Sequence, residues 1–304
     1  MTRRHEFRAM GCRMLGIVDS EPESRTLLRL PDQFEAWEQS LSRFRSDSEL
    51  CELNRNAGKQ MAVSQVLWDV FQSAVDAELQ SNGLVNPLIA DALVYAGYER
   101  SFDQMQEGEF GLNVTSSPNA VPVLADVRTD PTTRSIHLPA GSHLDFGGVA
   151  KGWAAQQAMQ ALSADGPALF SAGGDIAVSG PRANGEPWDI SVENPFESGG
   201  YLEMLYVNQG GVATSGKDYR NWTRGGVDQH HIIDPRTGLP AETDILTATV
   251  IAPTAMLAEA LAKAILISGS ADGLAWLNTD ERLAGLLVLD NGECLYSRNI
   301  ENYL

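Results

Sequence analysis

From Gly166 onward the sequence breaks into short β-rich segments that are separated by glycine, proline and asparagine turns. Four such segments follow one another: ALFSA, IAVSG, WDISVE and LEMLYV. Helices and strands therefore come in clusters, which argues against strict βαβ alternation and its parallel sheet. We predict an α+β fold with mixed or antiparallel sheets and packed helices.

Apolar residues at helical spacing predict helices in the rest of the chain. Pro31 suits the first position of a helix that runs to about Arg43, and Ser64 suits the N-cap of a second helix. We expect a third helix over residues 149–162 and a fourth, rich in alanine, over residues 253–267. An Asn-Gly turn in GLLVLD-NG-ECLYS predicts a final hairpin, and the polar stretch 101–123 predicts a surface segment.

The composition limits the possible partners. The chain has 304 residues, of which 43% are apolar and 20% charged, so it can bury a core as one large domain or two intimately packed ones. Acidic residues outnumber basic ones by 40 to 22, and the net charge is −18. Such a surface repels phosphate backbones and anionic lipid, so we expect no nucleic-acid partner. An anionic ligand would need a local patch of positive potential.

Targeting and redox signals are sparse. The N-terminus has no apolar leader and no run approaches the length of a membrane span, so we predict a cytoplasmic protein without membrane insertion. The cysteines, Cys12, Cys51 and Cys294, lie far apart without CxxC spacing. We expect them to be small buried residues and not a disulfide framework.

The segment DFGGVAKGW combines a glycine bend with a predicted helix start. Gly147 and Gly148 let the backbone approach a ligand, Asp145 can cap the turn, and Lys151 adds a point charge for a phosphate. A tight strand-to-helix turn without any ligand explains the same residues equally well.

A second motif, HHIIDPRTGLP, places a histidine against a stiff turn. Pro235 forces Asp234 toward extended geometry and Gly238 permits a tight reversal. His231 can then act as a general base, with Asp234 as its orienting partner or charge neighbour. The rival interpretation is a hydrogen-bonded structural histidine.

Several segments share their order along the chain with one known family. They are AMGC, SRFRSDSELCELN, GLVNPLIADALVYAGY, LDFGGVAKGW, SAGGDI, GEPWDI, ATSGKDYRNW, HHIIDPRTGLP and TVIAPTAMLAEALAKAIL. Together they resemble the ApbE family of FAD:protein FMN transferases. The resemblance implies a T-fold-like fold over residues 1–304, as one domain or as two intimately packed subdomains with the ligand cleft between them.

The resemblance also implies an activity. An ApbE-type enzyme cleaves the FAD pyrophosphate, attaches FMN to a threonine or serine hydroxyl of an acceptor flavoprotein, and releases AMP. Two alternatives remain open at this point: an FAD pyrophosphatase that releases FMN and AMP, and an FAD-binding protein without catalysis.

By the same resemblance His231 takes the position of the base, and a further set of residues would contact FAD. These are Met10, Phe44, Ala96, Gly97, Tyr98, Gly147, Lys151, Trp153, Ile233 and Lys263.

The late helix departs from the family pattern. Many members hold magnesium there through an aspartate and a threonine, together with a backbone carbonyl from the glycine loop. In this chain Glu259 replaces the aspartate, Ala150 would supply the carbonyl, and Lys263 replaces the threonine. A protonated lysine has only donors and cannot bind a metal ion. We therefore predict Mg²⁺ with weakened binding, and the Lys263 ammonium in part of its place, in contact with the diphosphate.

Overall fold

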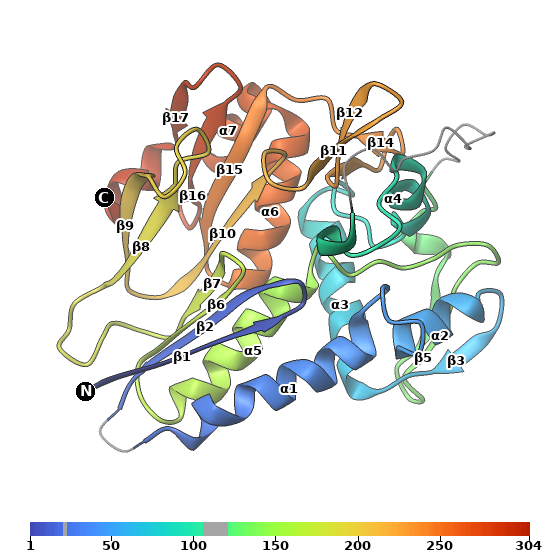
Figure 1. Ribbon diagram of the computed structural model, residues 1–304, viewed down its shortest axis with the longest axis horizontal. Helices are drawn as coiled ribbons and strands as arrows, with labels where there is room; N and C mark the ends of the chain where they lie inside the picture. Colours follow the sequence, from blue (N-terminus) through green and yellow to red (C-terminus); the bar gives the residue numbers. More distant parts are fainter. Residues whose placement is uncertain (21–22, 106–120) are drawn as a thin grey trace. The chain divides into compact units, whose positions relative to one another are not determined.

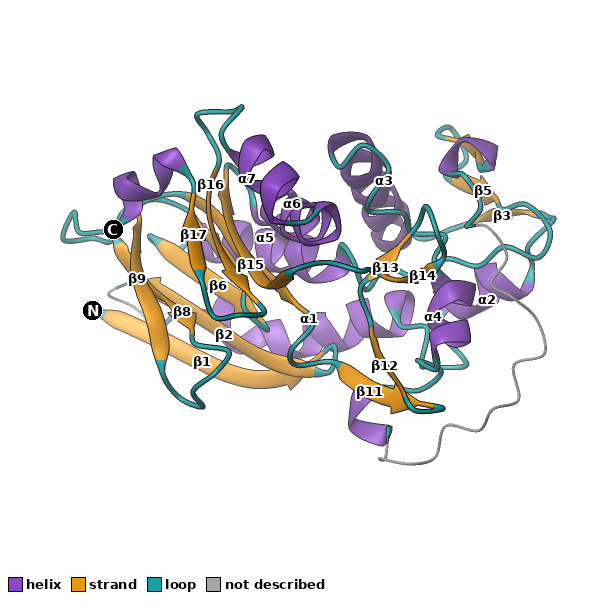
Figure 2. Ribbon diagram, turned by 90° about the horizontal axis from the view of Figure 1, so that it is seen from above, coloured by secondary structure: helices purple, strands orange, loops and turns teal. Residues whose placement is uncertain are grey.

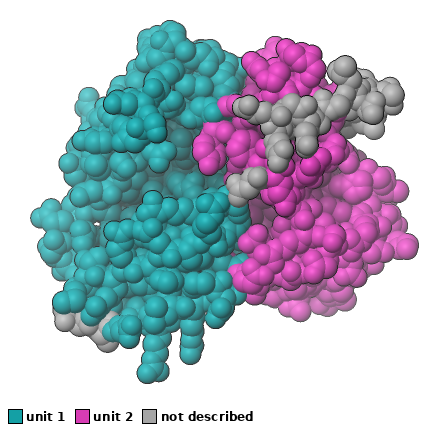
Figure 3. Space-filling view, viewed as in Figure 1, with its two compact units in different colours: residues 1–34, 151–218, 243–304 teal, residues 35–150, 219–242 magenta. Residues whose placement is uncertain are grey.

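The computed structural model describes residues 1–20, 23–105 and 121–304. The chain divides into two compact units (Figure 3). Unit 1 contains residues 1–34, 151–218 and 243–304, and unit 2 contains residues 35–150 and 219–242. Each unit is thus assembled from segments that are distant in the sequence.

An eight-stranded sheet forms the centre of unit 1, and each strand in it is antiparallel to its neighbours. The strand order is β1-β2-β6-β7-β10-β15-β16-β17 (Figure 1). The bounds are Thr2–Ala9 (β1), Cys12–Asp19 (β2), Ala168–Ala172 (β6), Asp175–Val178 (β7), Gly210–Gly216 (β10), Ile245–Ala252 (β15), Ala284–Leu289 (β16) and Cys294–Tyr296 (β17). This sheet confirms the predicted α+β class with antiparallel strands.

A separate hairpin covers one face of the sheet. It consists of β8 (Trp188–Glu193) and β9 (Tyr201–Val207), which pair with each other. Apolar residues alternate with polar ones along β8, so its buried side chains enter a core that also contains Val212 of β10 and Ile251 of β15.

Helices cover the opposite face. α6 (Ala255–Ser268) packs along β10 and β15, and α7 (Ser270–Leu277) packs on β16. Figure 2 shows α6 and α7 on one side of β15 and β16 and β9 on the other. Gly211 allows the close approach of α6, because a Cβ at this position would lie 2.4 Å from Ala255 Cα.

Unit 2 combines short helices with small sheets. Its helices are α2 (Glu49–Arg55), α3 (Gln65–Gln80) and α4 (Ala90–Ala96), and short 3₁₀ helices span Phe102–Gln104 and Leu124–Asp126. Its sheets are β3-β5-β4 (Gln60–Ala62, Ser135–His137, Arg128–Asp130), β11-β12 (Asn221–Arg224, Val227–His230) and β13-β14 (Ile233–Asp234, Leu239–Pro240). The helix α1 (Arg25–Leu41) begins in unit 1 and ends in unit 2, whereas α5 (Ala150–Ser163) belongs to unit 1 except for its first residue, and a 3₁₀ helix (Arg298–Tyr303) also belongs to unit 1.

The sequence located three of the four predicted helix starts, those of α3, α5 and α6, to within two residues. Ser64 caps α3 by accepting a hydrogen bond from the Leu67 N–H at 3.2 Å, as predicted. The start of α1 was predicted wrongly, because the helix begins at Arg25 and carries Pro31 in its interior. The Ser24 hydroxyl accepts the Leu27 N–H at 3.0 Å there, and the interior Pro31 removes one backbone hydrogen bond and crowds the Leu27 carbonyl.

Other expectations concern connections and membrane contact. The predicted final hairpin forms between β16 and β17. The predicted surface segment 101–123 falls largely on residues 106–120, which lie outside the described residues.

Among the described helices none is long and apolar enough to cross a bilayer. None of the three cysteines, all of which are among the described residues, forms a disulfide, but each is only partly buried, so the expectation that they are buried was wrong.

Candidate functional site

Four charged side chains from three elements of unit 1 form a cluster, which we call the lysine–carboxylate cluster. Lys151 lies in the first turn of α5, Asp175 begins β7, and Glu259 and Lys263 lie one turn apart on α6. Between β6 and β7 the chain reverses at Gly173 and Gly174, which both have positive φ. This reversal places Asp175 at the start of β7.

Glu259 lies at the centre of this cluster and is completely buried. Its Oε1 accepts a hydrogen bond from Lys263 Nζ at 3.0 Å and lies 3.5 Å from Lys151 Nζ. Its Oε2 accepts the Gly152 N–H at 2.8 Å. The Lys151 ammonium also donates to Asp175 Oδ2. Each carboxylate is therefore matched by an ammonium group.

Burial and pairing act in opposite directions on these groups. Burial raises the pKa of Glu259, but the Lys263 and Lys151 ammonium groups and the Gly152 N–H outweigh it and hold the pKa at about 2. Burial dominates at Asp175 and raises its pKa to about 6, although Lys151 lowers it. The pKa of Lys151 lies above its usual value because burial, which lowers it, is outweighed by Asp175 and Glu259.

The predicted magnesium site requires oxygen ligands around Glu259. Both oxygens of this carboxylate instead face N–H donors, and two of those donors belong to cations. Within the described part of the chain, no group of three or more His, Cys, Asp and Glu side chains gathers to hold a metal ion. The residues around Glu259 do not fit a divalent cation.

A second group of residues, in unit 2, contains two of the predicted aromatic residues, Phe44 and Tyr98. Tyr98 and Ile233 are buried in one apolar cluster together with Trp222. The Tyr98 ring lies 5.5 Å from Trp222 and 5.6 Å from Phe44, measured between ring centroids, and the Phe44 pair is edge-to-face. Phe44 remains 40% exposed, so its ring can cover a ligand. The Trp222 Nε1–H donates to the carbonyl of Ala96 at 2.9 Å.

Arg43 contacts both this aromatic cluster and Asp145, which precedes the glycine pair Gly147-Gly148. Its guanidinium carbon lies 4.1 Å from the Phe44 ring centroid and 4.7 Å from that of Tyr98, within cation–π range. Arg43 Nε also forms an ion pair with Asp145 Oδ2 at 2.5 Å, without hydrogen-bond alignment. Asp145 Oδ1 in turn accepts the Gly147 N–H at 2.7 Å, which confirms the predicted cap of this turn.

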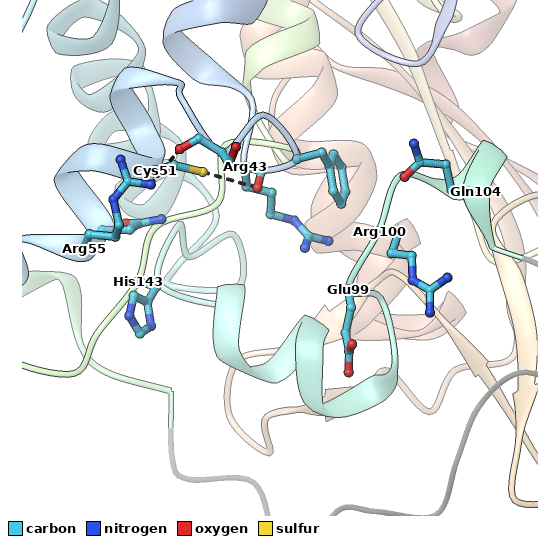
Figure 4. A pocket seen from close by; sticks show the side chains of 10 residues that line it. Arg43, Cys51, Arg55, Glu99, Arg100, Gln104 and His143 are labelled. Carbon is cyan, nitrogen blue, oxygen red and sulfur yellow. Dashed lines mark hydrogen bonds between the residues drawn. The ribbon is translucent and has the colours of Figure 1, made fainter.

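A cavity of about 410 Å³ opens beside Arg43 and Phe44. Three arginines contribute to its wall, Arg43, Arg55 and Arg100. Figure 4 shows Arg55 on one side, Glu99 and Arg100 on the other, and the Arg43 side chain between them. In this acidic protein the cavity therefore offers positive charge beside an aromatic ring, which suits an aromatic anion.

The His-Asp-Pro motif forms the stiff turn that its sequence predicts. β13 and β14 pair across it, the Gly238 N–H donates to Asp234 O at 2.8 Å, and Gly238 has a φ of +70°. His231 directly follows β12 and lies two residues before β13, and its N–H donates to the Arg220 carbonyl at 3.3 Å. Both carboxylate oxygens of Asp234 accept hydrogen bonds from Arg236, at 2.7 to 3.0 Å. The role of Asp234 beside His231 stays a prediction.

The remaining predicted residues occupy varied positions. Met10 adopts a φ of +50° in the turn between β1 and β2, and Gly97, with a φ of +104°, ends α4. Trp153 and Ala150 are buried in the first turn of α5. The structure thus divides the predicted FAD residues into two sets. Met10, Lys151, Trp153 and Lys263 belong to unit 1, and Phe44, Ala96, Gly97, Tyr98, Gly147 and Ile233 belong to unit 2.

Comparison with known proteins decides the family. The model of the ApbE family matches residues 15–287, which is most of the chain. The chain belongs to the ApbE family.

Two relatives of this ApbE protein are both named FAD:protein FMN transferase. The FAD:protein FMN transferase of Treponema pallidum is 30% identical over 261 residues, covering 76% of this chain and 68% of the relative. That of Vibrio cholerae serotype O1 is 27% identical over 267 residues, covering 86% of this chain and 77% of the relative.

Solved structures share the fold of this ApbE protein. The ApbE protein of Thermotoga maritima superposes with a TM-score of 0.87 at 23% identity, over 100% of this chain and 99% of that chain. The flavin transferase ApbE of Vibrio cholerae gives a TM-score of 0.78 at 20% identity, over 100% and 99% of the two chains. The ApbE fold predicted from the sequence is confirmed.

At Gly152 the helix α5 lies close to α6. A Cβ at this position would lie 2.8 Å from Ala255 O and 2.9 Å from Glu259 Oε2. We expect Gly152→Ala to lower the free energy of unfolding by about 1–3 kcal/mol, because the two helices must separate. Urea denaturation measures the change. Gly180→Ala is the control, since a Cβ there meets no atom within 4 Å, and an equal loss in both variants would contradict the explanation.

Proposed function

We propose that this protein is an FAD:protein FMN transferase. It cleaves the pyrophosphate of FAD, attaches FMN to a threonine or serine hydroxyl of an acceptor flavoprotein and releases AMP. The observation that carries the proposal is the convergence of Phe44, Tyr98 and Ile233 in unit 2, since these predicted flavin-contacting residues are far apart in the sequence. The names of the relatives over most of the chain support the same activity.

Binding of FAD needs an aromatic surface and positive charge. The exposed ring of Phe44, backed by Tyr98, offers a stacking surface for a planar ring system, and Arg43 holds its guanidinium against both rings. The buried ion pair with Asp145 fixes Arg43 in place, so little side-chain entropy is lost when the ligand binds.

Transfer needs a base for the acceptor hydroxyl, which is a poor nucleophile at neutral pH. In this proposal His231 takes the hydroxyl proton while the oxygen attacks the FMN phosphorus. The bond between that phosphorus and the bridging oxygen breaks, and AMP leaves with the bridging oxygen. The stiff turn around Asp234 and Gly238 supports this role, because it limits the motion of the backbone next to His231.

Magnesium is the remaining element implied by the family resemblance. When bound, a divalent cation would neutralise the charge of the diphosphate. The donors that already occupy Glu259 argue against such an ion at this carboxylate. We therefore assign no step of the reaction to a metal.

The proposal is tested by incubating the protein with FAD and a candidate flavoprotein acceptor. We expect mass spectrometry to show the acceptor heavier by one FMN group, and chromatography to show AMP in equal amount. Release of AMP and FMN without acceptor modification would instead indicate a pyrophosphatase. Unchanged FAD would indicate a binding protein without catalysis.

Phe44→Ala tests whether stacking on the Phe44 ring contributes to the affinity for FAD. We expect the affinity for FAD to fall about tenfold, because stacking on an aromatic side chain contributes about 1–3 kcal/mol. Quenching of flavin fluorescence measures the affinity. Phe196→Ala is a matched control, since Phe196 is also exposed but lies outside unit 2. Unchanged FAD affinity in Phe44→Ala would remove Phe44 from the site.

A further inference from the structure

The lysines of the lysine–carboxylate cluster are more exposed than its carboxylates. The side chains of Lys151 and Lys263 keep 18% and 13% of their exposure, whereas those of Asp175 and Glu259 keep 2% and 0%. The carboxylates are therefore sealed inside unit 1, whereas part of each lysine side chain reaches solvent. A ligand that approaches the cluster from solvent meets the lysines before the carboxylates.

The ammonium groups also have hydrogen-bonding capacity left. Each lysine ammonium carries three N–H donors. The structure gives Lys263 one carboxylate acceptor, Glu259 Oε1, and gives Lys151 the carboxylates of Asp175 and Glu259. Donors that are not directed at these carboxylates remain available to phosphate oxygens, and charge-assisted bonds of this kind are strong.

A divalent cation has no equivalent place in the cluster. To reach Glu259 it would have to displace the Lys263 ammonium from Oε1 and face the Lys151 ammonium 3.5 Å from the same atom. Repulsion between a doubly charged ion and two buried ammonium groups opposes this exchange.

We propose that Lys263, supported by Lys151, binds the diphosphate of FAD directly and replaces the divalent cation, so that binding and transfer need no metal. This inference rests on the proposed function for the identity of the ligand. Glu259 and Asp175 position the two ammonium groups, and the N–H of Gly152 fixes Glu259 from the other side. The two lysine side chains thereby supply the positive charge that a bound metal ion would otherwise supply.

The first test measures metal binding without any reaction. Protein freed of metals with EDTA is titrated with Mn²⁺, and the signal of free Mn²⁺ is followed by electron paramagnetic resonance, with and without FAD. We expect all Mn²⁺ to remain free and the affinity for FAD to be the same in EDTA and in Mn²⁺. Stoichiometric Mn²⁺ binding, or a tenfold gain in FAD affinity with Mn²⁺, would overturn the proposal.

The second test uses riboflavin as a probe without phosphate. In Lys263→Met we expect the affinity for FAD to fall about tenfold, as for loss of a charged hydrogen bond, and the affinity for riboflavin to stay unchanged. Lys217→Met is the matched control, because Lys217 also pairs with a carboxylate, Asp290 Oδ2 at 2.8 Å, but does not belong to the cluster. Unchanged FAD affinity in Lys263→Met, or equal losses for FAD and riboflavin, would overturn the proposal.

Lys263→Arg is a control for the possibility that Lys263→Met loses FAD affinity because it misfolds. It keeps the charge beside Glu259, so we expect it to retain most of the FAD affinity that Lys263→Met loses. Equal losses in these two variants would contradict a charge-based role. The Mn²⁺ titration needs no variant and no transfer. A protein that leaves Mn²⁺ free but forms no flavin adduct would therefore reject the proposed function and not this inference.

Discussion

Replacement of His231 by alanine is expected to lower the rate of FMN transfer at least about a hundredfold, the usual contribution of a general base. The affinity for FAD should change less than about twofold, since in the proposed mechanism His231 contacts the acceptor hydroxyl. Single-turnover formation of the covalent adduct, followed by mass spectrometry at saturating FAD, measures the rate.

The neighbouring histidine provides the control. His230 Nε2 lies 3.1 Å from the Ala241 carbonyl and its Nδ1 accepts the Ile232 N–H at 3.3 Å, so both ring nitrogens hold the turn. A neutral ring protonated on Nε2 satisfies both contacts. We expect His230→Ala to lower stability while the rate per folded molecule stays within about fivefold of wild type, far from the loss expected of a base. Parallel loss of FAD affinity and rate in His231→Ala would show that His231 only shapes the site.

Removal of the buried carboxylate in Glu259→Ala is the second large effect. The substitution leaves Lys151 and Lys263 without the acceptor that they share, inside the protein. We expect the free energy of unfolding to fall by about 3–5 kcal/mol, as when one partner of a buried ion pair is removed. Chemical denaturation monitored by circular dichroism measures the change.

A more exposed ion pair in the same unit serves as the comparison. Asp290, which accepts from Lys217, has a side chain that is 52% exposed. We expect Asp290→Ala to cost less than about 1 kcal/mol, because water replaces the lost partner. A loss in Glu259→Ala no larger than in Asp290→Ala would show that the cluster contributes little to stability.

The sequence predicted those parts of the fold that depend on local signals. A hydroxyl cap binds an N–H only three residues further on, so Ser64 identified the start of α3 without tertiary information. Pro31 misled the prediction of α1, because proline also suits a first helical turn, and nothing local excludes an interior position six residues after Arg25. The pairing of β2 with β6 joins residues that are far apart, and no local pattern could predict it.

The candidate site was predicted as a set of residues but without their partners. Trp222 lies in the segment ATSGKDYRNW, but only the fold shows that its ring contacts Tyr98. Arg43 was missed because its ion-pair partner, Asp145, lies far away in the sequence. Arg236 was missed although its partner, Asp234, is two residues away, because a basic residue in a turn is usually solvated. The pairing of Glu259 with Lys263 follows from helical periodicity, whereas the participation of Lys151 does not.

The strand order also has a consequence during synthesis. β15 and β16 lie between β10 and β17, although they belong to residues 243–304, which are synthesised after all the other residues of the two units. Until that segment emerges, β10 presents an unpaired edge to other nascent chains. A stalled or prematurely terminated polypeptide would keep this edge, so we expect early stop codons to cause aggregation and not the accumulation of a folded fragment.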